Sequence, residues 1–118
     1  MGHLSTHVLD TMNGCPAAGM AVTLQRVSGG QAVTLKSFTL NADGRSDCGA
    51  LLDAASMATG SYRLTFSVAP YFRGLGITLP DPPFLDQVAL DFGIADTAGH
   101  YHVPLLVSPW SYSTYRGS

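Results

Sequence analysis

Glutamate is absent from this 118-residue sequence, and lysine occurs only once, at Lys36. Charged residues make up 12% of the chain, about half of the roughly 25% that is typical of soluble domains. Because glutamate and lysine favour surface helices, their scarcity argues against a helical bundle. The hydrophobic share of 46% argues equally against a disordered chain. With a net charge of −2 and no cluster of Lys or Arg, the sequence also lacks the basic surface of a nucleic-acid-binding protein.

Cysteines and long apolar segments are also scarce. Cys15 and Cys48 are the two cysteines, too few for a disulfide framework, and we expect both to be reduced. No run of about 18 apolar residues occurs, so we expect no membrane-spanning helix. The first residues lack the basic and apolar segments of a secretion signal, which predicts a cytoplasmic protein. The length predicts a single domain over residues 1–118.

What the sequence does contain is alternation of apolar and polar residues, the pattern of a half-buried strand. The segments 20–24, 62–68 and 88–94 show it most clearly, and turns rich in glycine and asparagine separate them. The pattern predicts an all-β chain, an antiparallel β-sandwich. We expect a bulge or bend near Lys36 and Ser37, where the alternation slips by one residue. Pro70 and Gly76 predict one short helix over 70–75.

The strand predicted over 100–108 has an unusual outer face. Its core face would carry Tyr101, Val103, Leu105 and Val107, and its other face carries His100, His102, Pro104, Leu106 and Ser108. The segment 5–9 repeats this arrangement with Ser5, His7 and Leu9. An outer face this poor in charge predicts that another subunit covers it. Histidines at the edge of such an interface would lie in a partly dry cleft.

Each candidate residue also has a simpler explanation. A histidine on a strand is more often structural than catalytic, and His7 and His102 are too far apart in sequence to be placed together by spacing. His100 and His102 on one strand face, with His7 as a third ligand, are the residues of a possible zinc site. Arg45 follows a predicted turn over 41–44, and the simpler interpretation is a solvated arginine, with Asp43 or Asp47 as its candidate partner. The last four residues, taken alone, are typical of a frayed tail.

Four segments together resemble the transthyretin-related family of 5-hydroxyisourate hydrolases. They are LSTHVLD at 4–10, GCPAAGM at 14–20, NADGRSD at 41–47 and HYHVPLLVSPWSYSTYRGS at 100–118. The ending YRGS after HYHVPLL is the most specific of these motifs. The resemblance implies a transthyretin-like sandwich of two four-stranded sheets with one short helix. It also implies a homotetramer, a dimer of dimers with active sites at the dimer–dimer interface.

The resemblance further implies a site and a reaction. The family's catalytic histidines correspond to His7 and His102, its catalytic arginine to Arg45, and its substrate-binding tail to Tyr115, Arg116, Gly117 and Ser118, beside which we place Ser113. The implied reaction is the opening of the 5-hydroxyisourate ring to 2-oxo-4-hydroxy-4-carboxy-5-ureidoimidazoline in urate degradation.

Neutral imidazole suits proton transfer near pH 7, and guanidinium suits binding of substrate oxygens. The division of roles between the histidines stays open; we favour His102 as the orienting and His7 as the assisting group. We expect no metal and no other cofactor. The alternative function is a non-catalytic, transthyretin-like carrier of small molecules.

Overall fold

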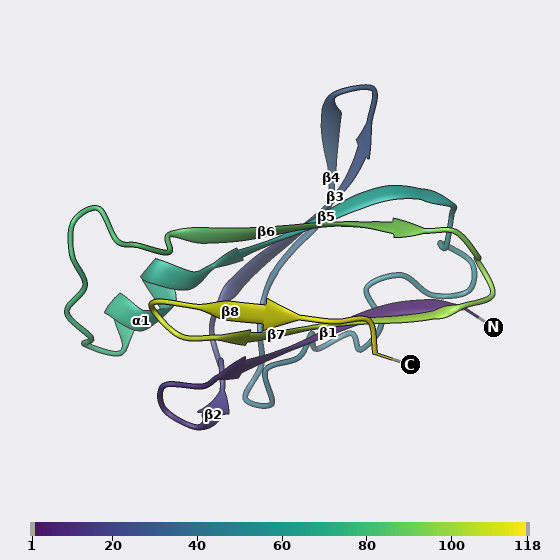
Figure 1. Ribbon diagram of the computed structural model, residues 1–118. Coiled ribbons are helices and arrows are strands. Elements are labelled where there is room, and N and C mark those ends of the chain that lie inside the picture. Colours follow the sequence, from purple (N-terminus) through teal and green to yellow (C-terminus); the bar gives the residue numbers. More distant parts are fainter. Residues whose placement is uncertain (1, 118) are drawn as a thin grey trace.

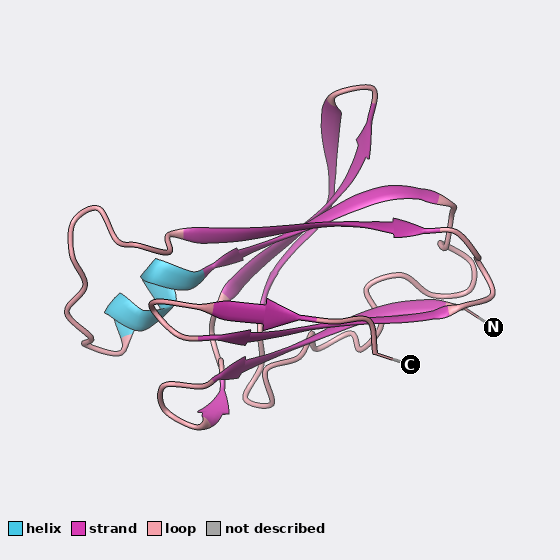
Figure 2. Ribbon diagram, in the orientation of Figure 1, coloured by secondary structure: helices cyan, strands magenta, loops and turns pink. Residues whose placement is uncertain are grey.

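The computed structural model describes residues 2–117 as two four-stranded sheets packed face to face, with one helix at an end of the sandwich (Figures 1 and 2). The first sheet has the order β2-β1-β7-β8, formed by β1 (His3–Asp10), β2 (Cys15–Pro16), β7 (His100–Val107) and β8 (Tyr112–Thr114). The second has the order β4-β3-β5-β6, formed by β3 (Ala21–Ser28), β4 (Gln31–Thr39), β5 (Gly60–Ser67) and β6 (Gln87–Ile94). The predicted sandwich of eight strands is confirmed.

The pairing of β1 with β7 differs from the antiparallel expectation. These two strands run parallel, with Ser5 opposite His102 and His7 opposite Pro104, whereas the other strand pairs are antiparallel. Alternation within a strand reports which side chains share a face but not the direction of the neighbouring strand, so the sequence alone left this pairing undetermined.

The core lies between the sheets and is built from the alternating residues that the sequence indicated. Leu4, Val8, Leu24, Leu64 and Leu105 are fully buried there. Burial alternates along β1 and β5 with a period of two, as expected of strands with one face on a core. The segments 20–24, 62–68 and 88–94 therefore face the core as predicted.

The irregularities of the fold lie close to the predicted positions. The register of β3 and β4 shifts between Leu24 and Gln25, which pair with Lys36 and Thr34, so Leu35 is the extra residue of a bulge, one position before the expected one. Beyond this point the β3–β4 hairpin rises away from the sandwich, at the top of Figure 1.

The helix α1 spans Val68–Gly74 and begins two residues earlier than the predicted 70–75. The reason is that the carbonyl of Asp86 accepts hydrogen bonds from the backbone N–H groups of Val68 and Ala69, both at 3.0 Å, which caps the first turn before Pro70. Gly76, with φ +82°, ends the helix as predicted. Within residues 2–117, no helix has the length and apolarity needed to cross a membrane.

Candidate active site

The parallel pairing of β1 and β7 brings the two predicted histidines onto one face of the first sheet. Because His7 lies opposite Pro104 and Ser5 opposite His102, the two imidazoles are diagonal neighbours on adjacent strands. Both side chains are half-buried on the face that points away from the core. This convergence of residues 95 positions apart is what the sequence could not establish by spacing.

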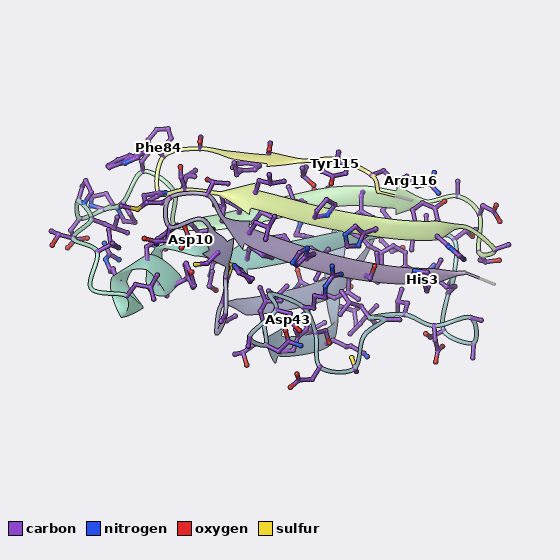
Figure 3. The ribbon with its side chains drawn as sticks, turned by 90° about the horizontal axis from the view of Figure 1, so that it is seen from below. His3, Asp10, Asp43, Phe84, Tyr115 and Arg116 are labelled. Atoms are coloured by element: carbon purple, nitrogen blue, oxygen red, sulfur yellow. The ribbon has the colours of Figure 1, made fainter. Side chains whose placement is uncertain are left out.

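Arg45 is brought to the same region by the 41–45 turn. The Asn41 side-chain oxygen accepts hydrogen bonds from the backbone N–H groups of Asp43 and Arg45, at 2.9 and 3.1 Å, which fixes the turn. Val8 then donates a backbone hydrogen bond of 2.9 Å to the carbonyl of Gly44. The turn therefore docks on β1 next to His7, and Figure 3 shows the labelled Asp43 alongside this strand.

Gly44 is required for this docking. Its φ of +74° lies in the left-handed region, and a Cβ there would lie 2.5 Å from the carbonyl oxygen of Val8. Within residues 2–117 the sole ion pair is that of Arg63 with Asp91, so the Arg45 guanidinium pairs with neither Asp43 nor Asp47. The ion pair that accompanied the simpler interpretation of Arg45 is not formed among the described residues, whereas the exposed side chain agrees with a solvated arginine.

The surroundings of His102 favour its neutral form. Burial lowers the pKa of the imidazole below its ordinary value of 6.5, and the positive charges of Arg45, His7 and His3 lower it further. A neutral imidazole can accept a proton, and a nearby guanidinium can stabilise an oxyanion. The arrangement is therefore suited to activating water beside a bound carbonyl compound.

The carboxy-terminal tail returns to His102 within the same chain. The backbone N–H of Gly117 donates a 2.7 Å hydrogen bond to the carbonyl oxygen of His102, and the two residues form an isolated β-bridge. A Cβ at Gly117 would lie 2.8 Å from Cδ2 of His102, so only glycine allows this approach. Contacts with β7 of the same chain therefore hold Gly117 in place.

The other described tail residues make no hydrogen bond or ring contact with His7 or His102. The Arg116 guanidinium lies 4.1 Å from the centre of the Tyr101 ring and donates to the carbonyl of His100 at 3.2 Å. Together with Tyr115 it lines a hollow of about 340 Å³ beside β6. In Figure 3 both labelled residues lie across β7 from the Asp43 turn. Ser113 is exposed opposite Leu106 on the edge strand β8, and Ser118 lies outside the described residues.

Two residues that sequence reasoning did not assign to the site belong to it. Ser5 Oγ lies 2.8 Å from Nδ1 of His102. The His3 ring packs against that of His100 at a tilt of 40°, with 4.3 Å between ring centres, and with Ser5 and Arg45 it lines an open depression of about 380 Å³. The signal was present in the sequence, because the alternation that placed His7 on the outer face places residues 3 and 5 there too.

The zinc alternative has no support in the side-chain arrangement. Among residues 2–117, no three His, Cys, Asp or Glu side chains are grouped so as to hold a metal ion, and His7, His100 and His102 do not form such a group. Cys15 and Cys48 are free and exposed, as the expectation of reduced cysteines requires.

Comparison with known proteins gives full-length matches. A model of the HIUase/Transthyretin family matches residues 4–117. A 5-hydroxyisourate hydrolase of Ralstonia nicotianae is 52% identical over 118 residues, which cover all of both chains.

The chain is also similar to solved structures. An (S)-allantoin synthase structure superposes with a TM-score of 0.93 and 48% identity; the match covers 99% of this chain but only 44% of that one. Sea bream transthyretin in complex with thyroxine superposes with a TM-score of 0.83 and 27% identity, over 97% of this chain and 93% of that one.

Proposed function

Because the chain belongs to the HIUase/transthyretin family, we propose that it is a 5-hydroxyisourate hydrolase of urate degradation. The observation that carries this proposal is the gathering of His7, Arg45 and His102 on one face of the first sheet, where Arg45 and His7 act electrostatically on His102. This set of residues supplies what hydrolysis of a cyclic amide needs: a proton acceptor, a second imidazole and a cation.

In the proposed reaction, water attacks a ring carbonyl of the bound substrate. The sequence favoured His102 as the orienting group, but its lowered pKa makes it the better proton acceptor in this proposal. Neutral His102 therefore accepts a proton as the carbon–oxygen bond forms, while His7 assists by orienting the water. Arg45 stabilises the oxyanion with its fixed cationic fork. The carbon–nitrogen bond then breaks, His102 returns the proton to the leaving nitrogen, and the product is 2-oxo-4-hydroxy-4-carboxy-5-ureidoimidazoline. A general base of this kind contributes about 10²–10⁴ in rate.

The tail has a proposed role in substrate binding. Gly117 lies against His102, and the two residues before it, Tyr115 and Arg116, line the hollow beside β6. We assign Ser113, Tyr115, Arg116, Gly117 and Ser118 to binding of the substrate's polar groups. Tyr115, at 62% exposure, has its side chain free to contact a ligand or another subunit.

The same family membership supports a homotetramer, a dimer of dimers with active sites at the dimer–dimer interface. The outer face of the first sheet fits this role because it carries the half-buried apolar side chains of Leu9 and Leu106 beside the histidines. Two free, exposed cysteines fit a reducing compartment, and we propose the cytoplasm.

The carrier alternative has weaker support. Identity to sea bream transthyretin is 27%, about half of the 52% shared with the Ralstonia hydrolase. A carrier needs a hydrophobic channel for its ligand but no proton acceptor at His102, whereas the lowered pKa of this residue serves a hydrolase directly.

The test is the decay of freshly generated 5-hydroxyisourate, followed by absorbance and corrected for the spontaneous reaction. We expect the protein to accelerate the decay, and His7→Asn, Arg45→Glu and His102→Asn each to lower kcat/KM by about 10²-fold or more, as expected for loss of a general base or of oxyanion stabilisation. Arg73→Glu is the matched control, because Arg73 lies exposed on α1, away from the site. Absence of acceleration by the unmodified protein, or full activity of all three variants, would contradict the proposal.

A further inference from the structure

The His102 ring is held at its Nδ1 atom by a neighbour on the adjacent strand. Ser5 is the register partner of His102, and its Oγ lies 2.8 Å from Nδ1 in a partly buried contact. Within residues 2–117 neither side chain makes another hydrogen bond. Ser5 Oγ and His102 Nδ1 are therefore each other's one hydrogen-bond partner within the described residues.

The tail restrains the opposite edge of the same ring. The backbone of Gly117 is bonded to the His102 carbonyl, and its Cα is so near the imidazole that an added Cβ would lie 2.8 Å from Cδ2. The ring is thus held between Ser5 at Nδ1 and Gly117 at Cδ2. Its remaining polar atom, Nε2, has no hydrogen-bond partner within the described residues.

The direction of the Ser5 hydrogen bond decides what Nε2 can do. A neutral imidazole carries one N–H and one lone pair. If Nδ1–H donates to Ser5 Oγ, the lone pair is at Nε2, which can then take a proton from water. If Ser5 donates to Nδ1, Nε2 carries the proton and cannot act as a base.

We propose that Ser5 is a positioning residue whose Oγ accepts the Nδ1 proton of His102 and so holds Nε2 as the proton acceptor. This inference rests on the proposed hydrolase function, because it assigns the reactive nitrogen of the same site. Ser5 acts through His102, on which Arg45 of the 41–45 turn and His7 and His3 of β1 also act electrostatically.

The test uses Ser5→Ala, with Ser5→Thr as the conservative variant that keeps a hydroxyl. Ser61→Ala is the matched control, because Ser61 is an exposed strand serine of the other sheet without a side-chain hydrogen bond. Nitrogen-15 NMR of the His102 ring, recorded at a pH where it is neutral, reports the tautomer. Steady-state kinetics with 5-hydroxyisourate separate kcat from KM.

We expect the Nδ1–H tautomer in the unmodified protein and a shift towards Nε2–H in Ser5→Ala. We also expect a fall of about tenfold in kcat, the worth of one hydrogen bond of about 1.4 kcal/mol, with KM within twofold. Ser5→Thr restores both the tautomer and kcat, and Ser61→Ala changes neither. A ring found as Nε2–H in the unmodified protein, or unchanged in Ser5→Ala, overturns the proposal.

These outcomes separate the inference from the function on which it rests. An unmodified protein that does not hydrolyse 5-hydroxyisourate but shows Nδ1–H at His102 contradicts the function and leaves the hydrogen-bond direction confirmed. An active protein with Nε2–H at His102 supports the hydrolase function and contradicts the proposed direction of the Ser5 hydrogen bond. If Ser5→Ala fails to fold, the spectrum of the unmodified protein and that of Ser5→Thr still decide the direction.

Discussion

The charge of Arg45 acts on His102 although the two residues come from distant parts of the chain. Arg45 has no ion-pair partner within the described residues, so its field is not neutralised locally. A cation near an imidazole disfavours the imidazolium, and it lowers the pKa of His102 together with burial, which is the largest cause. Arg45 therefore has two effects: it keeps His102 ready to accept a proton, and in the proposed reaction it stabilises the oxyanion.

Replacing Arg45 with Gln should raise the pKa of His102 towards its ordinary value of 6.5, because one of the charges that oppose protonation is removed. The activity of the variant should fall at a higher pH on the acidic side than that of the unmodified protein. An NMR titration of the His102 ring measures the pKa directly. The difference should be larger at low salt, since Arg45 is exposed and its field is screened.

Arg45→Lys and Arg73→Gln are the controls for this titration. The lysine keeps the charge and should leave the pKa of His102 near that of the unmodified protein. Arg73 is not among the groups that act on His102, so its replacement should have no effect. A pKa that stays constant or falls in Arg45→Gln would show that Arg45 does not influence His102 in solution.

At the scale of the elements, α1 is fastened to β1 by a buried polar cluster. The Tyr71 hydroxyl donates a 2.8 Å hydrogen bond to Oδ2 of Asp10, a carboxylate that is 1% exposed. Asn13 donates to both oxygens of the same carboxylate, from its side chain at 2.7 Å and from its backbone at 3.0 Å. This cluster lies at the end of β1 beyond His7, so it anchors the strand that carries one of the candidate catalytic residues.

Replacing Tyr71 with Phe should lower the free energy of unfolding by about 1–3 kcal/mol, because the buried Asp10 carboxylate loses one of its donors. Urea unfolding at pH 7 measures this loss. Tyr112→Phe is the matched control, since Tyr112 is exposed and lies on the edge strand β8. Equal stability of the two variants would show that the Tyr71 hydrogen bond contributes nothing to folding.

The same tyrosine predicts a dependence on alkaline pH. Burial raises the pKa of Tyr71 above its ordinary value of 10, and the neighbouring Asp10 raises it further. Since the folded state favours the neutral phenol, the stabilisation is fully present below pH 10 and is lost as the pH rises above 10. Tyr71→Phe should therefore lose less stability than the unmodified protein between pH 9 and pH 11 (about one unit on either side of the ordinary pKa).

For the whole molecule, assembly is the property that bears most on function. The outer face of the first sheet carries the candidate catalytic histidines and half-buried apolar side chains together. A subunit that covered this face would exclude water from around His102, and exclusion of water strengthens every charge interaction there. Assembly and catalysis are thus expected to depend on each other.

Leu106→Glu should weaken assembly, because it places a carboxylate on the half-buried outer face. Native mass spectrometry should show four copies for the unmodified protein and fewer for the variant, with a matching loss of hydrolase activity and an unchanged circular dichroism spectrum. Val33→Glu is the control, since Val33 is 60% exposed on the edge strand β4 of the other sheet. A variant that keeps both its mass and its activity would place the interface elsewhere.

Much of the fold could be predicted from the sequence because strand periodicity and turn chemistry are local. The alternation at 62–68 and 100–107 assigns each side chain to a face without knowledge of any partner, and the structure confirms those faces. Gly76 ended the helix where expected, since a left-handed conformation is a property of one residue. The start of the helix was missed because its cap is a carbonyl of Asp86, contributed from outside the helix.

The sequence by itself determined that His7 and His102 lie on outer strand faces, and its motifs identified the family. Only the tertiary structure decided that β1 and β7 pair in parallel, that Ser5 meets Nδ1 of His102, and that Gly117 lies on the ring while Arg116 turns towards Tyr101. The physical reason is that alternation reports the side on which a residue lies. Register and direction depend on hydrogen bonds between segments nearly a hundred residues apart.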